Sequence, residues 1–189
     1  MKASPKITKV SVTAFEHELE NVGKDYNTFN MVYESGSKLT QKGAILQIHT
    51  DQGIVGEYPG FNADVATVAQ YLIGKDALAR ESIYNDTKRG LRHGAMIGVG
   101  LVDICLWDIA GKLYDEPLYR LLGGEKKALP AYASTLHGDE NGGLQTPQDF
   151  ADFAEQCYEM GYRSFKVHGW GLARQGIQRE IDNVLNLGR

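Results

Sequence analysis

The first third of the chain alternates hydrophobic and polar residues over short runs, which is typical of strands with one buried face. Three such runs, at residues 7–15, 44–49 and 54–57, predict a three-stranded meander. The sequence Asp51-Gln52-Gly53 favours a tight turn between the last two. Residues 17–39 are polar, irregular and dotted with aromatic residues, so we expect a long loop there. This loop could be a lid over a site, or simply a mobile surface loop.

From residue 62 onward the hydrophobic residues recur every three or four positions, which predicts helices. They are expected from a cap at Asn62 or Asp64 to Gly74, over residues 79–88, over residues 95–112, and from Pro117 to Gly123. The helix at 95–112 is apolar almost all round and should be the buried centre of its domain. Within it, Asp108 is expected to pair with Lys112 one turn later.

Beyond Gly123-Gly124 the pattern changes to strict alternation of strands and helices. A strand is expected at 129–136, then a helix capped by Thr146 and ended by Gly161, a second strand at 162–170, and a helix marked by Ile177, Ile181, Val184 and Leu185. This order is typical of a parallel α/β layer. We therefore predict an α+β domain at residues 1–124 and a separate α/β segment at 125–189.

The second strand of this segment carries two titratable side chains at alternate positions. Lys166 and His168 should point to one face, and Phe165 and Val167 to the other. Burial of an unpaired cation costs several kcal/mol, which favours a site where something anionic meets them. A solvated edge strand explains the same residues about equally well.

Composition and charge argue against several classes of protein. The 189 residues carry a formal net charge of -4, and no face dense in lysine and arginine is evident, so a general nucleic-acid partner is not expected. Cys105 and Cys157 lie within apolar helical patterns and are expected to be buried thiols in a reducing compartment. No apolar run is long enough for a signal peptide or a membrane span, so we expect a cytoplasmic protein without a membrane partner.

One segment resembles a known family. Residues 100–112, running into Pro117-Leu118-Tyr119-Arg120-Leu121-Leu122-Gly123-Gly124, are similar to the mandelate racemase and muconate lactonizing enzyme branch of the enolase superfamily. Residues 7–10, 51–57 and 72–76 follow the order of that family. The resemblance implies an α+β capping domain at 1–124, followed at 125–189 by the first strand-helix units of a TIM-type (β/α) barrel.

The same resemblance implies a catalytic pair. Family members commonly carry Lys-x-Lys at the end of the second barrel strand, where the second lysine removes the proton next to a substrate carboxylate. Lys166 matches the first lysine, and His168 replaces the second. An imidazole titrates near neutrality, so His168 can serve as the base with Lys166 assisting it.

The implied function is that of the N-terminal part of a metal-dependent lyase, best fitted by a sugar-acid dehydratase. A racemase, epimerase or lactone cycloisomerase of the same family is the alternative, and a non-catalytic fragment or half of a split protein is another. The implied cofactor is Mg²⁺ with ligands beyond residue 189, so this chain alone is expected to be inactive. The expected partners are a small carboxylate substrate and, at full length, further copies of the same protein.

The resemblance also suggests substrate contacts. The capping segments and the ends of the barrel strands would supply Tyr26, Tyr58, Phe61, Ser134 and Trp170. Ordinary surface positions explain the first three equally well, and a buried strand position explains the serine.

Overall fold

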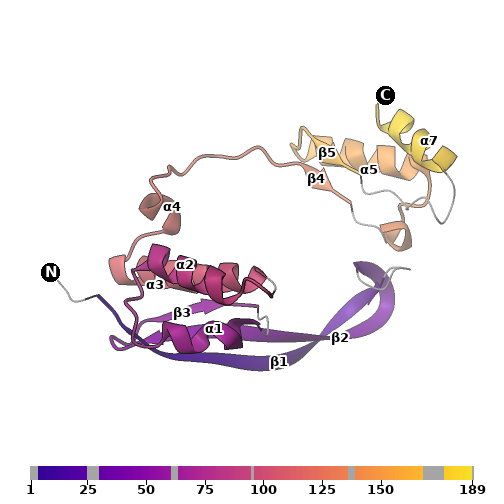
Figure 1. The fold of residues 1–189 in the computed structure, drawn as a ribbon. Helices are drawn as coiled ribbons and strands as arrows, with labels where there is room; N and C mark the ends of the chain where they lie inside the picture. Colours follow the sequence, from indigo (N-terminus) through magenta and orange to yellow (C-terminus); the bar gives the residue numbers. More distant parts are fainter. Residues whose placement is uncertain are drawn as a thin grey trace. The chain divides into compact units, whose positions relative to one another are not determined.

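The computed structural model describes residues 4–24, 30–60, 64–94, 96–135, 139–167 and 177–188. The chain divides into two compact units (Figure 1). The first unit consists of Met1–His17 and Lys42–Lys127, and the second of Glu18–Gln41 and Ala128–Arg189.

The first unit is built on a three-stranded sheet in the order β1-β2-β3 (Figure 1). The strands are β1 (Ile7–Lys24), β2 (Met31–Thr50) and β3 (Val55–Tyr58). The end of β1, from residue 18, and the start of β2, up to residue 41, belong to the second unit and form its two-stranded ribbon. β2 and β3 are antiparallel, with Leu46 opposite Tyr58. The predicted turn between them is confirmed, because Gly53 N donates to the Thr50 carbonyl oxygen at 3.2 Å. Gly53 has a φ of 73°, a conformation that glycine adopts without strain.

The prediction of a long loop at residues 17–39 was wrong, because β1 and β2 both run through most of this stretch. Polar groups pair across the two strands. Lys38 Nζ lies 2.7 Å from Glu18 Oε1, and the Gly36 N–H donates to Asn21 Oδ1 at 2.9 Å. Side chains on this ribbon are mostly exposed on both faces. Such a ribbon needs no hydrophobic alternation, so its sequence resembles that of a loop.

The helices predicted in the first unit are confirmed, with small shifts of their ends. They are α1 (Asp64–Leu72), α2 (Arg80–Gly90), α3 (Ile97–Tyr114) and α4 (Leu118–Leu121). Their apolar side chains join those of the sheet in one core, which includes Ile7, Leu46, Ile48, Val65, Val68, Leu72, Ile83, Val102, Cys105, Leu106 and Ile109.

The central helix α3 contacts β3, α1 and α2 (Figure 1). Its approach to β3 is so close that a Cβ atom on Gly56 would overlap the carbonyl oxygen of Cys105. Burial raises the pKa of the Cys105 thiol to about 12, in keeping with the predicted buried cysteine. One stripe of α3 is not buried, since Ile97 is 62% exposed and Ile104 is 40% exposed.

Two charged residues of α3 tie it to β3. The predicted pair is confirmed, with Lys112 Nζ 2.7 Å from Asp108 Oδ2. Lys112 also donates to the Val55 carbonyl oxygen at 2.7 Å, and Asp108 accepts from the Glu57 backbone N–H at 2.9 Å. Partial burial disfavours the charged lysine, but the hydrogen bonds and charges of Asp108 and Glu57 outweigh it and raise the pKa of Lys112.

The second unit contains β4 (Ala133–Ser134), a 3-10 turn η1 (Asp139–Gly142), α5 (Pro147–Glu159), β5 (Phe165–Lys166) and α7 (Ile177–Leu187). β4 and β5 pair in parallel with Ala133 opposite Phe165, so α5 is the crossover between parallel strands. The predicted order of strands and helices is thus confirmed. Both strands are much shorter than predicted, because only these paired residues form a ladder in the described part of this unit.

The start of α5 confirms the predicted cap. Thr146 Oγ1 accepts from the Asp149 N–H at 3.2 Å, and Asp149 Oδ2 accepts from the Thr146 N–H at 2.7 Å. These bonds, first among them that with the Thr146 side chain, lower the pKa of Asp149. Pro147 occupies the first turn, and Gly161 follows the helix with a φ of 105°.

Helix α7 packs along α5, but the face of α7 that is buried is not the apolar face expected from the sequence. Three of the apolar positions that predicted the helix are exposed, namely Ile181, Val184 and Leu185. Asn183 is instead fully buried, and its side-chain amide has no hydrogen-bond partner among the residues that the structure describes.

Candidate active site

The candidate site begins with two side chains on neighbouring parallel strands. Ser134 of β4 and Lys166 of β5 are register partners. The Thr135 N–H donates to the Lys166 carbonyl oxygen at 3.1 Å, which locks this register. Register partners in a sheet project to the same face, so the hydroxyl and the ammonium lie side by side on one face of the pair. Both residues are exposed.

The opposite face of the strand pair is closed by α5. The ring of Phe165 meets that of Phe153 edge to face, with the centroids 6.1 Å apart. Ala133, the register partner of Phe165, is 9% exposed. The predicted alternation along β5 is therefore confirmed for Phe165 and Lys166. Because the lysine is exposed, it carries no cost of burial in this arrangement.

Four of the predicted site residues lie outside the described residues: His168, Tyr26, Phe61 and Trp170. The pairing of Lys166 with His168 and the three aromatic contacts thus stay predictions. Tyr58 is described in the first unit, where it is half-buried and packs against the core. Its ring lies 2.9 Å from the position that a Cβ atom on Gly60 would take. Core packing accounts for Tyr58, and a contact with substrate stays a prediction.

Sequence reasoning missed a contact at the segment that follows β4. In η1, Asn141 Nδ2 donates to the Tyr33 carbonyl oxygen of β2 at 3.1 Å. A Cβ atom on the next residue, Gly142, would lie 3.6 Å from the Tyr33 ring. The contact joins residues that are 108 positions apart and involves a backbone acceptor, so no local pattern in the sequence could have indicated it.

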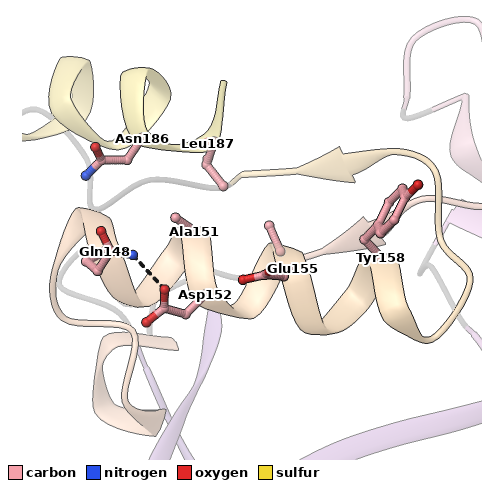
Figure 2. Close-up of a pocket in the computed structure, with 8 residues that line it drawn as sticks. Gln148, Ala151, Asp152, Glu155, Tyr158, Asn186 and Leu187 are labelled. Carbon is pink, nitrogen blue, oxygen red and sulfur yellow. Dashed lines mark hydrogen bonds between the residues drawn. The ribbon is translucent and has the colours of Figure 1, made fainter. Parts of the chain in front are cut away.

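The second unit also has a pocket between α5 and α7, which does not suit an acidic substrate. It has a volume of about 610 Å³ and is lined by Gln148, Ala151, Asp152, Ala154, Glu155, Tyr158, Asn186 and Leu187 (Figure 2). Two of its side chains are carboxylates, and Asp152 Oδ1 is bound by Gln148 Nε2 at 2.6 Å. The pocket lies on α5 and α7 rather than at the strand ends, and its charge would repel a carboxylate.

In the ranges that the structure describes, no group of three or more histidine, cysteine, aspartate or glutamate residues could hold a metal ion. These residues therefore do not fit a magnesium site. None of the described helices is both long enough and apolar enough to cross a membrane.

The family model of the mandelate racemase / muconate lactonizing enzyme N-terminal domain matches residues 22–123. The expected resemblance is thus confirmed.

Among curated proteins, the chain is 34% identical over 135 residues to D-mannonate dehydratase of Rhizorhabdus wittichii, covering 65% of this chain and 32% of that protein. It is 30% identical over 191 residues to arabinonate dehydratase of Saccharolobus solfataricus, covering 85% of this chain and 48% of that protein. Among solved structures, D-glucarate dehydratase of Agrobacterium tumefaciens, complexed with magnesium, matches with a TM-score of 0.80 and 26% identity, covering 98% of this chain and 51% of that one. The chain thus spans about half or less of the length of these relatives.

Proposed function

Since this chain belongs to the mandelate racemase / muconate lactonizing enzyme family, we propose that it is the N-terminal part of a dehydratase that acts on a sugar acid. The observation that carries the proposal is the match to arabinonate dehydratase over 85% of the chain, which is more than the 22–123 segment of the family model. It therefore includes residues outside the N-terminal domain. The relatives that are named as mannonate and glucarate dehydratases support the same class of substrate.

The proposed chemistry removes the proton alpha to the substrate carboxylate and expels the beta-hydroxyl group as water. His168 would take the proton, because it follows Lys166 by two positions on the predicted strand face. The Lys166 ammonium and the Ser134 hydroxyl, which share a face of the β4–β5 pair, would hold the carboxylate by charge and hydrogen bond. The enol left by the loss of water becomes a 2-keto-3-deoxy acid.

We propose further that β4, α5, β5 and α7 are the first strand-helix units of a (β/α) barrel, after an N-terminal capping domain. The parallel pairing of β4 with β5 across α5 supports this, as does the likeness to D-glucarate dehydratase. Magnesium is part of the proposal for the longer protein, on the strength of the magnesium complex of that relative. Its ligands would lie outside the described residues, and we place no step of the reaction on it.

The test is to assay the full-length protein that contains this chain on a panel of aldonic and aldaric acids with added Mg²⁺. We expect a 2-keto-3-deoxy acid, detected as its semicarbazone, from at least one of them. The Lys166→Ala variant should lose most of this activity, because it lacks the charge that would hold the carboxylate. An epimerised acid without any keto acid would refute the dehydratase and favour the racemase or epimerase alternative.

A further inference from the structure

The face of the β4–β5 pair that carries the candidate site also carries a tyrosine. Tyr132 directly precedes β4, and residues 132–135 alternate strictly between exposed and buried. Ala133 and Thr135 are at most 9% exposed, whereas Tyr132 and Ser134 are exposed. Side chains at alternate positions of a strand project to the same face. Tyr132 therefore points away from α5, to the open face that carries Ser134 and Lys166.

On this face Tyr132 lies diagonally across from Lys166. The Ala133 N–H donates to the Ser164 carbonyl oxygen at 3.0 Å, so the two chains still run side by side at the amino end of β4, where Tyr132 is next to Ser164. Adjacent strands are about 4.8 Å apart and two residues span about 6.6 Å along a strand, which places the Cα atoms of Tyr132 and Lys166 roughly 8 Å apart. Diagonal neighbours at such a separation are within reach of aromatic and long side chains.

The hydroxyl groups on this face differ in how far they stand from the backbone. Strand side chains project roughly perpendicular to the sheet. The hydroxyls of Ser134 and Ser164 are bonded directly to Cβ and stay close to the strands. The phenol oxygen of Tyr132 and the ammonium of Lys166 both lie at the ends of long side chains. Since a phenol oxygen can accept a hydrogen bond and an ammonium has three N–H donors, Tyr132 is the better placed acceptor for Lys166.

Packing within the described part of the second unit does not account for the Tyr132 ring, which is 56% exposed. In the barrel proposed for the longer protein, the open face would be turned inward, where bulky branched apolar residues usually fill the space. A buried tyrosine needs a hydrogen-bond partner for its hydroxyl. An ammonium that is removed from water needs acceptors. Tyr132 and Lys166 would thus each supply the group that the other requires.

We propose that Tyr132 is a positioning residue for Lys166. Its phenol hydroxyl accepts a hydrogen bond from the ammonium and holds it beside Ser134, where a carboxylate would bind. The contact itself depends on the pairing of β4 with β5 and not on the reaction. Its effect on catalysis rests on the proposed function, in which Lys166 holds the carboxylate of the sugar acid.

The test is the Tyr132→Phe variant of the full-length protein, which loses the hydroxyl and keeps the ring. Lysine amines are methylated with formaldehyde and a borane reductant, and the labelling of each lysine is followed by mass spectrometry on peptides. A nitrogen held in a hydrogen bond reacts slowly, so labelling of Lys166 should be several-fold faster in the variant. Labelling of the exposed Lys126, which is far from Lys166 in the sequence, serves as the internal reference and should not change.

The same variant has a kinetic signature. For a sugar acid that the full-length enzyme turns over, KM should rise several-fold with a smaller change in kcat, because a loosely held ammonium binds the carboxylate less well. Tyr158→Phe is the matched control, since it removes the same hydroxyl from a tyrosine that is 61% exposed on α5, the helix that covers the opposite face of the strands (Figure 2). It should leave both the labelling of Lys166 and KM unchanged.

Equal labelling of Lys166 in Tyr132→Phe and in the unaltered protein would overturn the proposal. So would faster labelling that comes with a lower free energy of unfolding in urea, since the hydroxyl would then support the fold rather than the ammonium. Labelling needs no substrate, so its outcome is separate from that of the dehydratase assay. An enzyme that is inactive on every acid would refute the proposed function and leave the labelling result standing.

Discussion

The contact between β3 and α3 yields the sharpest prediction, for the Gly56→Ala variant. The added methyl group would overlap the carbonyl oxygen of Cys105 and lie 2.8 Å from Ile109 Cγ1, where 3.4–4 Å is an ordinary contact. Helix backbone cannot rotate out of the way as a side chain can, so β3 must move. Overpacking of a core costs about 1–3 kcal/mol, and a backbone clash belongs at the upper end.

The movement would also strain the hydrogen bonds that flank Gly56, from Lys112 to the Val55 carbonyl and from the Glu57 N–H to Asp108. Each is worth about 1 kcal/mol, so we expect the free energy of unfolding to fall by about 3–4 kcal/mol. The measurement is urea unfolding followed by far-UV circular dichroism.

Gly100→Ala is the matched control, because a Cβ atom there meets nothing within 4 Å. Gly100 lies in α3, where alanine is favoured over glycine by about 1 kcal/mol, so this variant should be more stable than the unaltered protein. The same added methyl group thus has opposite effects at the two positions. A Gly56→Ala variant as stable as the unaltered protein would show that β3 and α3 are not in this close contact.

Two further predictions concern the second unit. Asp149→Asn should destabilise α5 at pH 7. Bonds to Thr146 lower the pKa of Asp149 in the folded state, so the ionised carboxylate stabilises the fold. This stabilisation is present above the usual aspartate pKa of 3.8 and is lost as pH falls through the lowered value. Urea unfolding at pH 7 and below pH 4 should therefore show the gap to the unaltered protein closing, and a constant gap would contradict the role of the charge. Asn183→Leu should raise the free energy of unfolding by about 1–2 kcal/mol, since it removes a buried amide that has no partner among the described residues. The half-exposed Asn186 offers the control, as Asn186→Leu should gain nothing, and equal effects of both variants would show that Asn183 is not buried.

The elements that could be predicted from the sequence are those whose partners are close along the chain. The turn at 51–53 and the box formed by Thr146 and Asp149 depend on hydrogen bonds that span three or four residues, so the residue types alone indicate them. The same holds for Asp108 and Lys112, one helical turn apart. In each case the local signal and the fold agree.

The elements that were missed depend on distant partners. The ribbon formed by residues 18–24 and 31–41 is bridged by pairs such as Lys38–Glu18 and contacted by Asn141, and none of these contacts follows from hydrophobic spacing. The register between two strands also depends on residues that are distant in the sequence. Alternation along β5 separates Lys166 from Phe165, but only the pairing of β4 with β5 reveals that Ser134 is the neighbour of Lys166.

The position of Lys166 also changes the reason to expect a site there. A buried cation needs an anionic partner, but Lys166 is exposed on the face of the strand pair that α5 leaves open. In the barrel proposed for the longer protein, helices cover the outside of the strands, so the face opposite α5 would be turned inward. The ammonium would then be enclosed, and the cost of several kcal/mol for an unpaired buried charge would return. A carboxylate substrate beside Lys166 and Ser134 is the partner that would offset it.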